Sequence, residues 1–246
     1  MRRLDTFMLL DAWDRGHTLP ADAWALWLLG AALAQTQAGV PAEDVRFWPV
    51  GVRDRELLRL RAAQFGARLE GLAGCPLCGA SAEFELTADA LLAAPSTPGI
   101  AQLEIDGLRV ECRPVNTDDL LAIDATADVD SVANALFDRC VVVTGHDGAT
   151  LSASSVPPAV RVAVNEHLER ADPQADVRLH IQCPACAHEW QAGFDIVSYL
   201  WKEVADWARR TLGDVHELAS AYGWSEAEIL ALSPSRRQYY LGMLTT

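Results

Sequence analysis

Two motifs of the same form, Cys-Pro-x-Cys, hold four of the six cysteines in this chain. Cys75 and Cys78 belong to the first motif, and Cys183 and Cys186 belong to the second. Two thiolates at this spacing can grip one face of a tetrahedral ion, while backbone N–H groups in the turn offset their negative charge. A structural zinc site takes four such ligands, so the two motifs together predict one structural zinc ion per chain.

The separation of the two motifs is unusual, because residues 79–182, a stretch of 104, lie between them. Closing a flexible loop of that length costs about 4 kcal/mol. Structural zinc in small peptides contributes roughly 10–16 kcal/mol, so metal binding outweighs the cost of closure. Four thiolate ligands would also close the coordination shell, and we therefore expect the site to carry out no catalysis.

The cysteines allow other interpretations that the sequence leaves open. Iron uses the same four ligands in rubredoxin-like sites. Two separate redox pairs would need a thioredoxin-like βαβ setting, which the sequence does not show. His188 follows Cys186 closely and could replace one thiolate, although we expect it in the strand after the motif. Cys112 and Cys140 stand alone, and we expect both to be small buried side chains.

Other polar groups have the residue types of a functional site but not its pattern. His146, Asp147 and Ser152 are the three residue types of a hydrolase catalytic triad. They all lie in one polar loop, however, and the serine lacks the G-x-S-x-G turn that surrounds the nucleophile in such enzymes. The aspartates between Asp118 and Asp130 lack the glycine and the closing glutamate of a calcium loop. We expect these aspartates to cap helices and to face solvent.

A run of arginines lies just before the first cysteine motif. Such a run could bind nucleic acid, but acidic residues interleave with the arginines, and a helix would spread them around its surface. The sequence therefore favours solvated ion pairs. The arginines concerned are Arg53, Arg55, Arg59, Arg61 and Arg68.

The elements that must position the cysteines follow from hydrophobic periodicity. Strands are expected at 82–86, 177–181 and 188–194, next to the two motifs, and Asp106-Gly107 predicts a tight hairpin within 103–113. Apolar residues at helical spacing predict one long helix from Ile196 to Ala219, ended by Gly223. Shorter helices are expected at 4–13, 53–65, 117–123, 131–141 and 160–170, and a further helix should begin at residues 19–22. After the long helix, a capping box at 225–228 should begin a short helix, and Ser233-Pro234 should begin the last one.

These elements predict a mainly helical α+β fold around a split zinc ribbon. The N-terminal helical region would span 1–70, and the two halves of the ribbon would span 71–92 and 176–194. An insertion with a hairpin and helices would occupy 93–175, and a C-terminal helical region would occupy 195–246. Trp201 and Trp207 flank the apolar stripe of the long helix, and Trp224 follows its end. Because aromatic residues are enriched at interfaces, we expect a partner to bind in this tail.

Composition and charge restrict the class of function. The formal net charge is −14, and an acidic chain repels phosphate backbones over long range, which disfavours nucleic-acid binding. No stretch approaches the roughly 18 uncharged apolar residues of a membrane-spanning helix. No secretory signal is visible either, so we expect a cytoplasmic protein whose thiols stay reduced.

Several segments, taken together with the two cysteine motifs, form a pattern that runs through most of the chain. They are 51–58, 64–66, the first motif at 75–78, the second motif at 183–186, 188–190, 194–196, 215–219, 222–226, 229–232, 236–241 and, within the insertion, 113–120 and 138–140. This pattern resembles the small baseplate proteins of contractile phage tails, namely the T4-type hub-assembly proteins and their relatives in contractile injection systems, and the insertion matches least well. The resemblance implies a non-enzymatic role in building the baseplate and brings no catalytic residues.

The sequence therefore predicts a structural or assembly protein of a phage-tail-like contractile machine. Its expected partners are other baseplate or tail proteins, and it would either join the particle or only help to assemble it. Two alternatives stay open. A zinc-ribbon regulator would bind nucleic acid, against the acidic charge of the chain, and a CxxC redox protein would use the cysteines in pairs.

Overall fold

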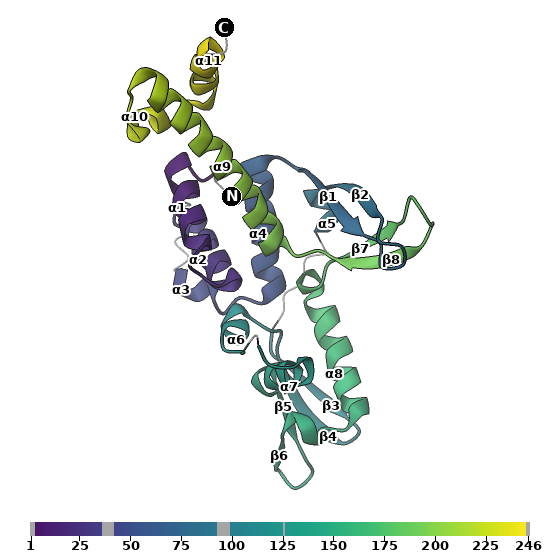
Figure 1. Cartoon of the computed structure of the whole chain (residues 1–246). Helices are drawn as coiled ribbons and strands as arrows, with labels where there is room; N and C mark the ends of the chain where they lie inside the picture. The colour runs from purple at the N-terminus through teal and green to yellow at the C-terminus, as the bar shows by residue number, and fades with distance from the viewer. Residues whose placement is uncertain (1–2, 36–41, 93–98, 125, 245–246) are drawn as a thin grey trace.

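The computed structural model describes residues 3–35, 42–92, 99–124 and 126–244. It is an α+β fold in which helices predominate. Within these residues, four helices form the N-terminal part and three form the C-terminal part (Figure 1). The N-terminal helices are α1 (Thr6–Gly16), α2 (Ala21–Ala34), α3 (Ala42–Val45) and α4 (Val50–Phe65), and the C-terminal helices are α9 (Ile196–Tyr222), α10 (Glu226–Ala231) and α11 (Pro234–Leu244).

Helix α9 packs against both the N-terminal helices and the other C-terminal helices. Its N-terminal half packs against α1, α2 and α4, where Leu200 and Val204 enter the largest hydrophobic core. Trp24 and Leu57 lie in the same core with at most 1% of their surface exposed. Gly223 ends α9 in the left-handed conformation, as its position after the apolar stripe predicts.

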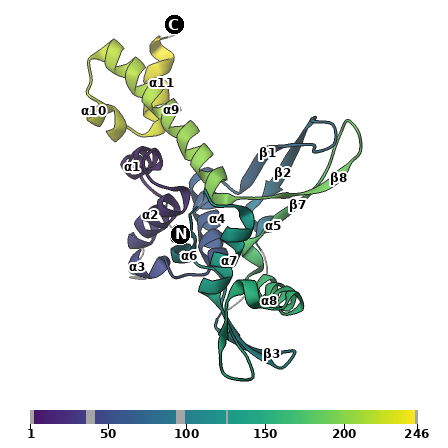
Figure 2. The same ribbon diagram turned by 60° about the horizontal axis from the view of Figure 1, so that its bottom comes forward.

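Two separate antiparallel hairpins carry the cysteine motifs. Both lie on the same side of the helical body, with β2 next to β7 (Figures 1 and 2). The first hairpin was only half predicted, because β1 has a single buried side chain, Leu69, and two glycines that obscure the strand pattern. The strands are β1 (Arg68–Gly74) with β2 (Ser81–Thr87), and β7 (Arg178–Gln182) with β8 (Glu189–Gly193).

The segment between the hairpins forms a four-stranded antiparallel sheet in the order β3-β4-β5-β6, together with helices. Asp106 and Gly107 both have positive φ, which confirms the predicted tight turn. Val110, Val143 and Val160 belong to a second hydrophobic core. The elements are α5 (Ala88–Leu91), β3 (Ala101–Ile105), β4 (Leu108–Cys112), α6 (Thr117–Leu121), α7 (Val129–Cys140), β5 (Val141–Thr144), β6 (Thr150–Leu151), η1 (Ala153–Ser155), α8 (Pro158–Ala171) and η2 (Pro173–Ala175).

This middle segment is bonded to the start of α4. The Val50 N–H donates to the Val115 carbonyl at 2.9 Å, and the Gly51 N–H donates to the Asp172 carboxylate at 2.9 Å. A side chain at position 51 would collide with Asp172, since a Cβ there would lie 2.0 Å from Oδ1. Glycine at 51 therefore allows a carboxylate from the end of α8 to cap α4.

The expectation that the arginines before the first motif are solvated is wrong for two of them. Arg53 and Arg61 are each 3% exposed. Arg53 bonds to Asp22 and Asp54, and Arg61 bonds to Glu203 on α9. Helical periodicity alone could not reveal this burial, because two of the three carboxylates, Asp22 and Glu203, come from other helices.

Candidate metal centre

The first cysteine motif forms the tip of the β1–β2 hairpin. The Cys75 N–H donates to the Ala80 carbonyl at 2.9 Å, and the Gly79 N–H donates to the Cys75 carbonyl at 2.9 Å. These two bonds close a tight turn, which requires a left-handed residue after the second cysteine. Gly79 fills that position with φ of 74°, a region that glycine enters without steric cost.

The second motif forms the tip of the β7–β8 hairpin with the same bonds. The Cys183 N–H donates to the His188 carbonyl at 2.8 Å, and the Ala187 N–H donates to the Cys183 carbonyl at 3.0 Å. Here the left-handed residue is Ala187, with φ of 58°, where an L-residue other than glycine is disfavoured. The two motifs thus adopt the same turn although one of them lacks the favourable residue.

The two turns bring four sulphur atoms together. All four Sγ atoms lie within 4.8 Å of one another. The Sγ of Cys75 is 3.7 Å from that of Cys186, and the Sγ of Cys78 is 3.6 Å from that of Cys183. Each of these contacts joins the buried first cysteine of one motif to the exposed second cysteine of the other. The predicted cluster is therefore present, and it links segments 105 residues apart.

The spacing of the sulphurs fits a metal ion better than a disulfide. Zinc–sulphur bonds of about 2.3 Å in a tetrahedron place the sulphurs about 3.8 Å apart. A disulfide would bring two sulphurs to about 2.05 Å, far closer than the contacts seen here. Among the described residues, no other group of His, Cys, Asp or Glu side chains gathers in this way, and His188 does not belong to the cluster.

Electrostatics also favour a cation among the four sulphurs. Burial raises the pKa of Cys183, but the N–H groups of Cys186 and Ala185, together with the thiols of Cys186 and Cys78, outweigh it and lower this pKa to about 7. The His188 N–H lowers the pKa of Cys186, yet desolvation and the neighbouring sulphurs raise it to about 12. Ionising a second thiol beside the first thiolate is therefore unfavourable, unless a bound cation neutralises the charge of both.

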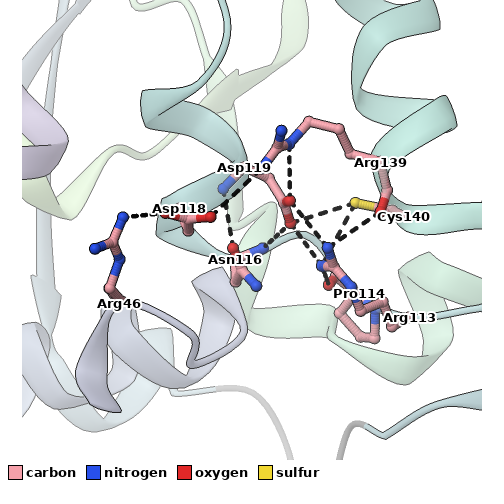
Figure 3. Close-up of polar contacts among 8 residues, drawn as sticks. All are labelled: Arg46, Arg113, Pro114, Asn116, Asp118, Asp119, Arg139 and Cys140. Atoms are coloured by element: carbon pink, nitrogen blue, oxygen red, sulfur yellow. Dashed lines mark hydrogen bonds and ion pairs between the residues drawn. The ribbon is translucent and has the colours of Figure 1, made fainter. Parts of the chain in front are cut away.

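A second buried polar cluster surrounds Asp119 (Figure 3), and sequence reasoning missed it. The side chain of Asp119 is 1% exposed and pairs with Arg113 at 2.6 Å and with Arg139 at 3.0 Å. The Asn116 N–H donates to the same carboxylate at 3.1 Å. The cluster fixes α6 and α7 to the end of β4. A capping box of Asn116 and Asp119 beside Arg113 was the available signal.

The chemistry of this second cluster is that of a structural ion pair. Burial raises the pKa of Asp119, but the arginines and the Asn116 N–H outweigh it and lower the pKa to about 2. Burial, and then the charge of Asp119, raise the pKa of Cys140 to about 12. Cys140 therefore stays a thiol and donates to Asp119 at 3.4 Å, and Cys112 is 1% exposed. Both are buried, as predicted.

The remaining candidates form local turns and caps. Asp147 accepts a hydrogen bond from the Ala149 N–H, and the hydroxyl of Ser152 bonds to neighbouring serines. These two side chains of the supposed triad therefore stabilise the loop itself. Asp128 caps α7, and Asp124 accepts from Thr126. Asp119 helps to cap α6, as expected, but its carboxylate faces two arginines and not solvent, so the expectation of exposure is wrong for it.

Comparison with known proteins gives no relative: no protein-family model, no curated protein and no solved structure matches the chain. Within the described residues, no helix has both the length and the apolar character needed to cross a membrane. Any functional conclusion must therefore rest on the chain's own residues.

Proposed function

We propose that the four cysteines hold one structural zinc ion in a split zinc ribbon. We further propose that the chain is a non-enzymatic assembly protein of a phage-tail-like contractile particle. The observation that supports this most is the closed set of four thiols at the tips of two hairpins. Four protein ligands leave a tetrahedral ion no open position for substrate or water, which favours a structural role.

A split ribbon would allow one ion to hold several parts of the chain together. The β1–β2 hairpin follows α4, and the β7–β8 hairpin leads into α9. An ion bound between their tips would fix the exit of α4 relative to the start of α9. It would also close the ends of the middle segment, which is already bonded to α4 through Val115 and Asp172. Removal of the ion would then loosen the junction of all these parts.

The assembly role rests on the resemblance of several segments to baseplate proteins together with the closed character of the metal centre. Its partners would be other baseplate or tail proteins, and the chain would act in the cytoplasm, where such particles assemble. The net charge of −14 argues against the alternative of a nucleic-acid-binding ribbon. A duplex whose binding weakened with added salt would favour that alternative instead.

Co-expression with the sheath and baseplate proteins of a contractile tail tests the assembly role. We expect the chain to co-purify with at least one of these proteins and to elute with it in gel filtration. The Cys183→Ser variant should lose this association, whereas Cys112→Ser, which replaces an equally buried cysteine outside the cluster, should retain it. A wild-type chain that elutes alone in the presence of all these proteins would contradict the proposal.

A further inference from the structure

Helix α11 carries an exposed face that no other element in the described part of the chain covers. Helices α10 and α11 pack on the distal half of α9, at the end farthest from the middle segment (Figures 1 and 2). The inner face of α11 contributes Tyr240 and Leu241 to a small core with Leu218. On the outer face, Tyr239 is 68% exposed and Met243 is 51% exposed.

These exposed side chains form a stripe along one side of the helix. Arg236, Tyr239 and Met243 lie at positions i, i+3 and i+7, which share a face of an α-helix. An amphipathic helix that docks in a groove presents its anchors with this spacing. Tyrosine, arginine and methionine are also residue types that interfaces enrich. The inner face is held by the core with Leu218, so the stripe is displayed in a fixed orientation.

The charge of α11 is opposite to that of the remaining chain. Residues 233–246 contain Arg236 and Arg237 and no acidic residue, a net charge of +2. The rest of the chain has 18 basic and 34 acidic residues, a net charge of −16. Arg237 is buried and donates to the Leu232 carbonyl, so Arg236 is the exposed cation of this helix. An acidic surface on a partner would complement it.

We infer that the outer face of α11 docks into an apolar groove with an acidic rim on another tail or baseplate protein. Tyr239 and Met243 would fill the groove, and Arg236 would face the carboxylates at its rim. A symmetric pairing of two α11 helices is a poorer occupant, because it would bring like charges together and α11 itself offers no carboxylate. This inference rests on the proposed function and adds to it the surface and the chemistry of the partner.

Binding of the full-length chain to co-expressed sheath and baseplate proteins tests the inference. The double variant Tyr239→Asp, Met243→Asp should retain about tenfold less partner, or less still, because two anchors would carry charge into an apolar groove. Arg236→Glu should weaken binding and reduce its dependence on salt. The control Val129→Asp changes a residue that is 83% exposed on α7, far from α11, and should bind as wild type does. Circular dichroism and metal content should be the same in all four proteins.

The possible outcomes separate this inference from the proposed function. A double variant that retains the partner as well as wild type does would overturn the role of α11 and leave the assembly function standing. A wild-type chain that retains none of the tail proteins would overturn both. If light scattering gave the mass of a homodimer for wild type and of a monomer for the double variant, a second copy would be shown to cover the face. That result would overturn the assigned occupant.

Discussion

The four-cysteine cluster and the Asp119 cluster both need positive charge to balance their acidic side chains, but they differ in where that charge comes from. Both gather ionisable side chains from separate segments into a buried or half-buried position. Asp119 receives its counter-charges from Arg113 and Arg139, so that cluster is complete within the chain. Among the described residues, no arginine or lysine bonds to the four clustered sulphurs, whose contacts are with one another and with backbone N–H groups.

The difference teaches which parts of the molecule depend on an external ligand. A carboxylate between two guanidinium groups is stable without help, whereas four adjacent thiolates need a cation. The junction of the two hairpins should therefore respond to metal, and the junction of α6, α7 and β4 should not. The following experiments either break this contrast or sharpen it.

Metal removal should have the largest effect. Treatment with a strong chelator should lower the thermal midpoint by more than about 10 °C, because structural metal contributes several kcal/mol or more to folding. Hydrogen exchange should show that the tips at Cys75–Gly79 and Cys183–Ala187 lose protection first, while α6 and α7 keep theirs. Equal loss of protection at both clusters would break the contrast.

Asp119→Asn should be the most damaging change at the second cluster. It leaves Arg113 and Arg139 close together without their shared carboxylate. Because these two side chains are 33% and 37% exposed and water can reach them, the loss should be about 2–3 kcal/mol, less than for a fully buried pair. Urea denaturation should measure this loss of free energy of unfolding, and metal content should stay at the wild-type value. A stability within 1 kcal/mol of wild type would show that the cluster is dispensable.

Acid should separate the two clusters by pH. The pKa of Asp119 is lowered to about 2 in the folded protein, so the stability it contributes is complete above about pH 4 and is lost as the pH falls toward 2. Protons compete for thiolates at much higher pH, so metal release should come first. We expect the step between pH 4 and 2 to be missing in Asp119→Asn, as an acid titration followed by circular dichroism would show. A single transition in which metal release and loss of structure coincide would contradict this order.

The smallest effects are expected from substitutions at the left-handed residue of each turn in the metal centre. Ala187→Gly should raise the free energy of unfolding by about 1 kcal/mol, because glycine tolerates the left-handed conformation there. Gly79→Ala should lower it by a similar amount, since a Cβ at 79 meets no atom within 4 Å and only the backbone conformation is penalised. Opposite signs in metal-loaded protein confirm that both turns have the same geometry, and equal signs would contradict it.

Local patterns predicted much of the fold and both cysteine motifs, and the need of a structural zinc site for four ligands predicted that the two motifs meet although they are 105 residues apart. The repeated Cys-Pro-x-Cys motif, the Asp106-Gly107 turn and the stripe that begins at Ile196 each depend on residues close in sequence. The burial of Arg61 could not be predicted in this way, because its partner Glu203 lies 142 residues away. The β1 strand was missed for a related reason: its pairing with β2, not its own apolar pattern, defines it.

Metal content of the native protein tests the central claim most directly. Mass spectrometry of the native chain, with Cys183→Ser and Cys112→Ser in parallel, compares two cysteines that are 2% and 1% exposed, of which only Cys183 belongs to the cluster. We predict one zinc ion per chain in wild type and in Cys112→Ser, and none in Cys183→Ser, which should also be less stable. A wild-type protein without metal, or a Cys183→Ser variant as stable as wild type, would contradict the account.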